Sequence, residues 1–423
     1  MRVVSAAEAV SHIRSGDHVF VHGAAAVPNA LLAALVARAA DLRDVVMTHL
    51  HVEGPGPHLA PEMAPHFRHR ALFIGSNARR AVNEGRAEYV PVFLSDIPYL
   101  MRRGSVQVDV ALLNVTPPDR HGFCSLGTSV DVAQAAVRAA RLVIAQLNPA
   151  MPRTLGDGFV PAARIDYGVA VSEPPASVPL PEIGEVEHAI AARIAALVPD
   201  RATIQMGIGA IPTAVALALT NHRDLGIHSE MITDVVVELV ERGVVTGAHK
   251  EVDHGKVVSA FLTGTQRLYD FVDDNAAVEM RPADYTNDSA VIRRFRRMTA
   301  INSAVEVDLT GQVCADSLGH QLLSGVGGQM DFIRGAALAE DGRAIIALPS
   351  TAAGGTYSRI VTTLRPGAGV VTTRAHVETV VTEHGVANLV GRSIPERARA
   401  LIGLADPRFR ESLEREAREL RLV

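Results

Sequence analysis

The chain carries the same short pattern in each of its halves, and this duplication constrains the fold more than any other feature. Residues 21–28 and 205–212 both contain the end of an apolar strand and a glycine that stands five positions before a proline. An Ala/Leu-rich helix follows in each half, and then an apolar run that reaches His49 or His228. The shared order of elements indicates an internal duplication. Strands that alternate with helices predict an α/β fold, with mainly parallel sheets in two tandem open domains of similar topology.

Individual elements of the first half can be placed from hydrophobic periodicity and from helix-start signals. Proline is favoured at a helix start because its missing N–H would be unpaired there, so Pro28 marks the beginning of one helix. The sequence predicts helices at residues 5–14 and 28–39, and strands at residues 17–22 and 45–50.

A proline-rich segment separates the two halves. Residues 172–181 cannot continue a helix or a central strand, because proline lacks the N–H that either would need. We therefore predict a linker here, between an N-terminal domain at residues 1–182 and a C-terminal domain at residues 183–423.

Charge and composition exclude several classes of function. A formal net charge of -5 argues against a nucleic acid or an anionic membrane as partner. The only lysines, Lys250 and Lys256, lie outside any GxxxxGK[ST] loop, so direct ATP hydrolysis is not expected. Cys124 and Cys314 are too few for a disulfide framework. Because we find neither an apolar run of about 18 residues nor a signal-peptide core, the expected compartment is the cytoplasm.

Glu230 is the first candidate for chemistry. Residues 225–231 form an apolar strand that is predicted to end in this carboxylate. Side chains at the C-terminal ends of parallel strands point into the crevice where α/β proteins bind ligands, and a carboxylate there can act as base, metal ligand or nucleophile. Alternatively, Glu230 merely favours the N-terminus of a helix predicted at residues 233–242. His228 should point to the same side, where it either orients the site or is simply packed.

Two glycine-rich segments could bind an anion or a carbonyl oxygen. Residues 207–212 join a strand to a helix, so their amides can face an oxygen-rich ligand at the helix N-terminus. Residues 324–332 begin with three glycines in four positions, which lets the backbone approach a ligand and form an oxyanion cradle. On its own, either segment is explained equally well by a tight turn.

A group of histidines raises a metalloenzyme as a different class of function. His49 and His51 would share one strand face, with Glu53 in step and His66 and His69 further along the chain. A His-x-His pair can bind zinc. The spacing fits no metal-binding motif and no cysteine joins the group, so we expect packed or solvated histidines and no metal.

Taken together and in this order, the three candidate segments resemble the acetyl-CoA hydrolase/transferase family, whose members include 4-hydroxybutyrate and butyrate:acetate CoA-transferases. The resemblance covers nearly the whole chain, and it is specific in combination although each piece alone is not. The further segments that carry it are residues 109–113, 116–119, 122–127, 300–304, 348–351, 358–361 and 406–410.

The resemblance implies a role for each matching position. Glu230 corresponds to the catalytic nucleophile, and the active site is expected at the interface of the two domains. CoA and acyl-CoA are then substrates, and no prosthetic group is implied. The residues expected to bind CoA or the thioester oxygen are Gly207, Ile208, Gly209, Ala210, Ile211, Asn302, Ser324, Gly327 and Gly328.

The chain departs from the family pattern in two places. Where relatives often carry a lysine, residues 352–355 read Ala-Ala-Gly-Gly, which puts a direct salt bridge to a CoA phosphate in doubt. Arg359 or Arg374 is the candidate substitute. His384 stands where a tyrosine is expected before residues 385–387, a difference that would fall in the acyl pocket.

The implied activity is transfer of CoA from an acyl-CoA to a small carboxylic acid of the acetate, butyrate or 4-hydroxybutyrate type. It would follow ping-pong chemistry through a glutamyl-CoA thioester on Glu230. One alternative is an acyl-CoA hydrolase that uses the same glutamate, and another is a non-catalytic CoA-binding protein that tolerates its loss. A homodimer is expected because symmetric pairs are the commonest assemblies.

Overall fold

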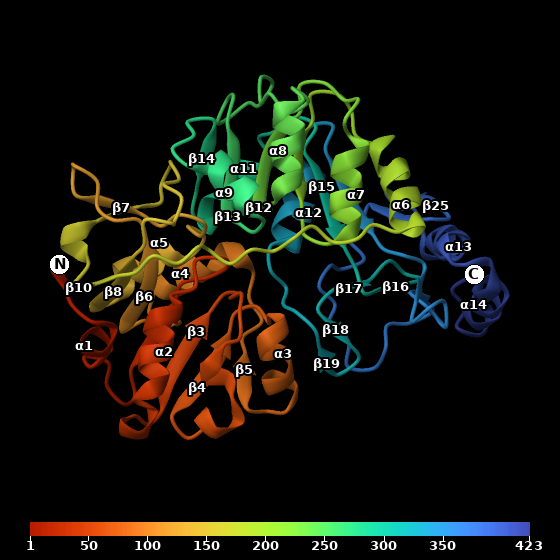
Figure 1. Ribbon diagram of the computed structural model, residues 1–423. Coiled ribbons are helices and arrows are strands. Elements are labelled where there is room, and N and C mark those ends of the chain that lie inside the picture. The colour runs from red at the N-terminus through yellow and green to blue at the C-terminus, as the bar shows by residue number, and fades with distance from the viewer. The chain divides into compact units, whose positions relative to one another are not determined.

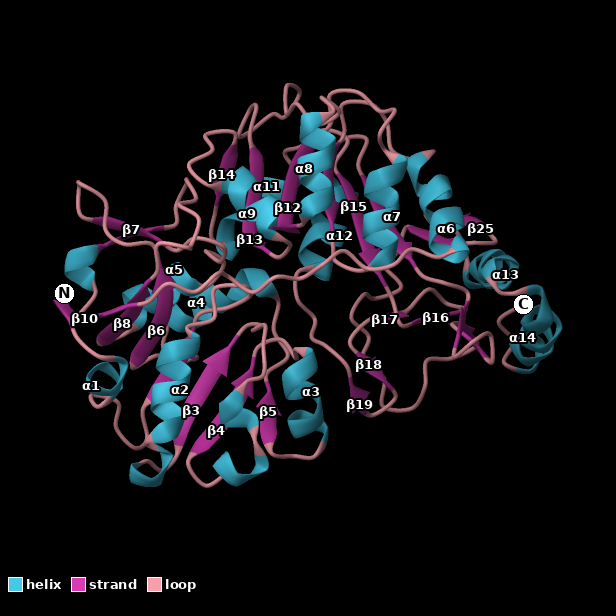
Figure 2. Cartoon of the chain, in the orientation of Figure 1, coloured by secondary structure: helices cyan, strands magenta, loops and turns pink.

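The computed structural model describes residues 1–423, which form two compact units (Figures 1 and 2). Unit 1 comprises Met1–Pro179, Val258–Thr286 and Leu323–Gly327, and unit 2 comprises Leu180–Val257, Asn287–Leu322 and Gly328–Val423. Residues 172–181 contain neither helix nor strand, as the predicted linker requires. The division into domains at residue 182 stays a prediction. None of the helices has both the length and the apolar character needed to cross a bilayer.

Unit 1 is built on an eight-stranded sheet in the order β1-β10-β8-β6-β2-β3-β4-β5. All neighbouring strands pair in parallel. The strands are β1 (Arg2–Val3), β2 (His18–Val21), β3 (Val45–His49), β4 (Phe67–Ala71), β5 (Ala87–Tyr89), β6 (Val110–Val115), β8 (Leu142–Leu147) and β10 (Tyr167–Ala170). Two further strands, β7 (Phe123–Ser125) and β9 (Phe159–Pro161), form an antiparallel pair.

Alternate side chains of the unit 1 strands form its core. Val19 and Val21 of β2, for example, share a cluster with Leu31 and Leu35 of the neighbouring helix, as the two-residue period of a strand requires. The helices of this part are α1 (Ala6–Val10), α2 (Asn29–Ala37), α3 (Ser76–Asn83), α4 (Ile97–Arg102) and α5 (Ala133–Ala139). The four elements predicted in the first half are confirmed, each somewhat shorter than predicted.

A later segment of the chain clusters with unit 1. It contains β13 (Val257–Leu262), α9 (Gln266–Val272), β14 (Val278–Met280) and α10 (Ala283–Thr286). Backbone bonds from Val130 and Asp131 to the Ala260 carbonyl join this segment to the first part of the chain. The compact units therefore do not follow the chain order strictly.

Unit 2 contains a run of six neighbouring strands in the order β12-β11-β15-β20-β24-β25. They are parallel except for the β24–β25 hairpin. The strands are β11 (Thr203–Met206), β12 (Gly226–Ile232), β15 (Thr299–Ser303), β20 (Arg343–Ala347), β24 (Thr379–Thr382) and β25 (Gly385–Asn388). The short strands are β16 (Glu306–Asp308), β17 (Val313–Cys314), β18 (Ser317–Leu318), β19 (Gln321–Leu322), β21 (Thr351–Ala352), β22 (Tyr357–Ser358) and β23 (Ile360–Val361).

Helices cover both faces of the unit 2 sheet. The first three, α6 (Glu185–Ala195), α7 (Ala210–Ala218) and α8 (Asp234–Glu241), lie side by side in front of the strands (Figure 1). The others are α11 (Ser289–Ile292), α12 (Gln329–Leu338), α13 (Ile394–Leu404) and α14 (Pro407–Glu419). Buried Phe332 of α12 shares a core cluster with Ala300 of β15 and Ile346 of β20.

The two sheets confirm the predicted duplication. The order β3-β2-β6-β8-β10 in unit 1 matches the order β12-β11-β15-β20-β24 in unit 2. In each case a strand, a helix and an adjacent parallel strand follow one another along the chain, as β2-α2-β3 and as β11-α7-β12. The predicted fold class, two α/β domains of similar topology with mainly parallel sheets, is therefore correct.

Candidate active site

Glu230 lies within β12 rather than at its end, because the strand continues for two residues to Ile232. Thr233 then caps helix α8, so the predicted helix start is correct. Side chains alternate along the strand. His228, on the same side as Glu230, is fully buried, with its ring centroid 4.6 Å from that of Phe295. Of the two predicted roles of His228, orienting the site or simply packing, these contacts favour packing.

The Glu230 carboxylate is held by an asparagine that the sequence does not single out. The Asn287 side-chain amide donates to Glu230 Oε2 at 2.9 Å and to Asp331 Oδ2 at 3.2 Å. Asn287 is fully buried and Asp331 is 9% exposed, whereas Glu230 is half-buried. Because one NH₂ group supplies both bonds, Asn287 fixes the relative positions of the two carboxylates.

Helix α12 begins directly against this carboxylate. Gly328 is its N-cap, and a Cβ added there would lie 1.8 Å from Glu230 Oε2 and 2.1 Å from Asn287 Nδ2. Only glycine leaves room for so close an approach. The backbone N–H groups at a helix N-terminus carry partial positive charge, and a carboxylate is favoured beside them. An ionised, oriented carboxylate is what a nucleophile requires.

The first glycine segment forms the turn between β11 and α7. Gly209 caps the helix with φ +106°, a conformation that L side chains rarely adopt, although a Cβ there would meet nothing within 4 Å. The glycine is therefore needed for its backbone angle, and the space around it is open. Ile208 at the tip is 60% exposed, whereas Ile211 in the first turn is buried. The turn can thus present an amide-lined, partly apolar surface to a ligand.

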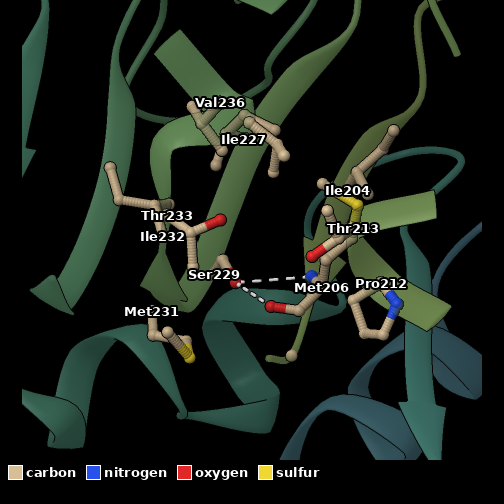
Figure 3. A pocket seen from close by; sticks show the side chains of 12 residues that line it. Ile204, Met206, Pro212, Thr213, Ile227, Ser229, Met231, Ile232, Thr233 and Val236 are labelled. Atoms are coloured by element: carbon tan, nitrogen blue, oxygen red, sulfur yellow. Dashed lines mark hydrogen bonds between the residues drawn. The ribbon is translucent and has the colours of Figure 1, made fainter. Parts of the chain in front are cut away.

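Side-chain bonds connect the strand ends that carry these residues. The Ser229 hydroxyl donates to the Met206 carbonyl at 3.0 Å, which ties β12 to the end of β11 beside the glycine turn (Figure 3). On the other side of β11, the Asn302 amide donates to Gln205 Oε1 at 3.0 Å. Glu230, the glycine turn and Asn302 therefore come from three neighbouring parallel strands, β12, β11 and β15.

A small pocket lies beside the glycine turn, lined by Gly207, Pro212, Thr213 and the β12 residues Ile227, Ser229, Met231 and Ile232 (Figure 3). Three of these β12 residues alternate with Glu230 along the strand, and Glu230 is not among the lining residues. The pocket is a gap in the packing of β12 against α7 and α8, and it does not contain the candidate nucleophile.

The first part of the second glycine segment belongs to unit 1 and the rest belongs to unit 2. Residues 323–327 cluster with unit 1, where the Val326 amide donates to the Tyr89 hydroxyl at 3.1 Å. The Leu94 amide donates to the Gly327 carbonyl, also at 3.1 Å. Gly328 begins the unit 2 part of the segment. Of the three positions matched to the thioester-oxygen site, Gly328 lies against Glu230 within unit 2, while Ser324 and Gly327 belong to unit 1.

The residues at the departures from the family pattern lie elsewhere in unit 2. Arg359 is half-buried and donates to the Ala304 carbonyl at 3.4 Å, and its burial lowers the pKa of the guanidinium. Arg374 is exposed. His384 occupies the β24–β25 turn at the edge of the sheet, four strands away from β12, which is about 19 Å at the usual strand spacing. It therefore does not line the immediate surroundings of Glu230.

Comparison with known proteins adds a family assignment to this geometry. Residues 1–179 match the acetyl-CoA hydrolase/transferase N-terminal domain, and residues 264–417 match the C-terminal domain of the same family. The chain is 48% identical to 4-hydroxybutyrate coenzyme A transferase of Clostridium kluyveri, over 98% of this chain and 97% of that protein. It is 36% identical to butyryl-CoA:acetate CoA-transferase of Anaerostipes caccae, over 100% and 97% of the two chains.

Solved structures agree with the sequence relatives. RipA from Yersinia pestis superposes with a TM-score of 0.94 at 36% identity, covering 100% of this chain and 98% of that one. The predicted family resemblance is confirmed by these matches.

Proposed function

Because the chain belongs to the acetyl-CoA hydrolase/transferase family, we propose that it is a CoA-transferase with Glu230 as its covalent nucleophile. Its substrates are an acyl-CoA and a small carboxylic acid of the acetate, butyrate or 4-hydroxybutyrate type. Two contacts of the Glu230 carboxylate carry the proposal. Asn287 donates a hydrogen bond to it, and the N-terminus of α12 lies against it.

The first half-reaction loads the enzyme. A Glu230 carboxylate oxygen attacks the thioester carbonyl, the C–S bond breaks, and CoA leaves as a thiolate, which produces a mixed anhydride. The thiolate then attacks the Glu230 carbonyl, and the first acid leaves as its carboxylate. The product is a glutamyl-CoA thioester, and no proton is gained or lost in the balance.

The second half-reaction reverses these steps with another acid. Its carboxylate attacks the glutamyl-CoA carbonyl and releases the thiolate, which attacks the acyl carbonyl of the new anhydride. A new acyl-CoA leaves and the Glu230 carboxylate is regenerated. Because the thioester bond energy passes from acid to acid, ping-pong kinetics follow.

The surrounding residues assist this chemistry in separate ways. Asn287 holds one carboxylate oxygen, which orients the attacking group and reduces the freedom lost in the transition state. Each tetrahedral intermediate places negative charge on an oxygen, and we assign its stabilisation to the amides at the start of α12, which begins against Glu230. We assign the β11–α7 turn, with Gly207 to Ile211, and Asn302 to CoA binding.

The test is covalent trapping. The protein is mixed with acetyl-CoA or butyryl-CoA, reduced with sodium borohydride, digested and mapped by mass spectrometry. Borohydride converts a glutamyl thioester to the alcohol, so the wild type should show that modification at Glu230, and Glu230→Gln should not. Glu241→Gln, an exposed glutamate on α8, is the matched control and should label normally. Absence of label across a panel of acyl-CoAs would remove the covalent mechanism.

The products of the same reactions distinguish a transferase from a hydrolase. With acetate or butyrate added, a transferase forms a second acyl-CoA, whereas a hydrolase forms only free CoA. A non-catalytic CoA-binding protein would bind CoA without either product, and its binding would survive Glu230→Gln. The proposed homodimer is tested separately by the mass of the protein in solution.

A further inference from the structure

Three buried histidines converge on one face of the unit 1 sheet. His49 ends β3 and His69 lies in the adjacent strand β4 (Figure 1). The strand register pairs Met47 with His69 and His49 with Ala71, so the two histidines share a face, one pleat apart. The third, His58, comes from a short 3₁₀ helix, η2 (Pro57–Leu59). Their exposed fractions are 2%, 4% and 2% for His49, His69 and His58.

The chain turns sharply to bring His58 over the strands. Gly56, immediately before η2, has φ +57°, a left-handed conformation that favours glycine, and Pro57 then starts the helix. The ring centroid of His58 lies 4.9 Å from that of His49 and 5.5 Å from that of His69. The rings of His49 and His69 are 4.4 Å apart.

The polar atoms of this cluster are poorly satisfied by the protein. His49 Nε2 and His58 Nε2 lie 2.9 Å apart, but Nδ1 of His58 and both ring nitrogens of His69 are buried without a hydrogen-bond partner. A buried polar group without a partner costs about 1–3 kcal/mol. No acidic side chain belongs to the cluster, so nothing stabilises a protonated ring.

We propose that His49, His58 and His69 bind one divalent transition-metal ion of the zinc class, which holds β3, η2 and β4 together. Each residue offers a ring nitrogen, and these atoms all lie within 4.8 Å of one another. Tetrahedral zinc with Zn–N bonds of about 2.0–2.1 Å separates its ligands by about 3.4 Å. Small movements of the rings around a common centre therefore complete the set.

The donor chemistry narrows the choice of metal. Neutral imidazoles suit zinc, copper, nickel and cobalt, whereas magnesium and calcium prefer oxygen ligands. Burial lowers the pKa of His58 to about 4 and that of His69 to about 3, so both rings are neutral near pH 7. Three protein ligands leave a fourth position for water.

The cluster differs from the histidine pair that the sequence suggested. β3 ends at His49, and His51 lies beyond it, with its Nε2 2.7 Å from Glu53 Oε1. His66 binds the Leu42 carbonyl instead of joining the group. The partners of His49 are thus His58 and His69. The site lies in unit 1 and does not depend on the proposed CoA chemistry.

The test is a titration of the full chain with Co²⁺ after dialysis against EDTA, followed by competition with Zn²⁺. We expect visible d–d absorption that saturates at one equivalent per chain, and a rise in the unfolding temperature with added metal. Loss of one ligand in His58→Gln or His69→Gln should weaken binding by more than about 100-fold. His121→Gln, an exposed histidine, is the control and should bind like the wild type.

Two results would overturn the proposal. One is the absence of stoichiometric Co²⁺ or Zn²⁺ binding at micromolar concentrations, which would mean a neutral hydrogen-bonded histidine cluster. The other is binding that neither His58→Gln nor His69→Gln weakens. Should these variants fail to fold, X-ray absorption of the Co²⁺-loaded wild type decides, because the site requires three imidazole nitrogens around the metal.

Discussion

The contact between Gly328 and Glu230 allows a sharp test of the active-site geometry. In Gly328→Ala the new methyl group would lie 1.8 Å from Glu230 Oε2, and real Cβ atoms essentially never approach another atom closer than 3.0 Å. The carboxylate must therefore retreat by about 1.2 Å, and Asn287 Nδ2, at 2.1 Å, must move as well. The hydrogen bond of 2.9 Å between them cannot survive both movements unchanged.

The expected fall in kcat follows from the displaced carboxylate and its disturbed hydrogen bond. A hydrogen bond to a charged group contributes about 1.5–3 kcal/mol, and misplacing a reacting group by about 1 Å can cost on the order of 100-fold in rate. We expect kcat to fall by about 100-fold, which corresponds to about 2.7 kcal/mol in the activation barrier. The KM for acyl-CoA should change much less, because the methyl group disturbs the nucleophile.

The assay is acyl-CoA formation from a donor acyl-CoA and acetate, with circular dichroism and the unfolding temperature as controls for folding. Gly403→Ala is the matched control, since a Cβ at that position within α13 meets nothing within 4 Å. In a Glu230→Asp background the carboxylate is one methylene shorter, so adding Gly328→Ala should cost less than it does in the wild type. A folded Gly328→Ala protein with kcat within threefold of the wild type would refute the reasoning.

Three further predictions rest on other contacts. Asn287→Ala should lower kcat by about 10- to 100-fold because Glu230 loses its charged hydrogen bond, whereas thermal unfolding should show a folded protein. Gly209→Ala forces a side chain into φ +106°, so isothermal titration should show weaker CoA binding and calorimetry a lower unfolding temperature. Burial lowers the pKa of His22 to about 4, so the folded state binds fewer protons than the unfolded state between that pH and about 6.5. The contribution of neutral His22 to the free energy of unfolding is fully present above about pH 6.5 and falls by about 3 kcal/mol as the pH drops to 4. The denaturation midpoint of His22→Gln should therefore depend less on pH than that of the wild type.

Much of the scaffold follows from local sequence patterns. Strand and helix positions in the first half depend on apolar periodicity and on Pro28, and these act over a few residues. The duplication is visible because glycine and proline recur at the same offsets in residues 21–28 and 205–212. Gly209 could be identified for the same reason, since its backbone angle is a local requirement.

The contacts of Glu230 depend on long-range folding and were not predictable from one sequence. Asn287 reaches the carboxylate, and Asp331 reaches Asn287, from segments far away in the chain, and no spacing rule connects them with β12. Asp331 lies within the second glycine segment, residues 324–332, but no pattern in the sequence distinguishes it there. Gly328 was identified through the family resemblance, but its steric reason appears only when α12 is placed against β12. His58 was missed because a 3₁₀ turn, with no periodic signal, carries it into the sheet.

The duplicated scaffold explains why chemistry is assigned to one half. The strand registers show which positions of the two units are equivalent. Phe20 of β2 is opposite Thr48 of β3, just as Ile204 of β11 is opposite Ile227 of β12. His49 and His228 each follow one residue later, so they occupy equivalent positions. Two residues beyond them are His51 in unit 1 and Glu230 in unit 2. His51 is bonded to Glu53, whereas Glu230 faces Asn287 and a helix N-terminus. A helix N-terminus stabilises an anion and not a cation, so the unit 2 environment suits a carboxylate nucleophile. The equivalent strand of unit 1 instead places its buried histidine, His49, among other imidazoles, so the duplicated strands differ in the side chains that surround them.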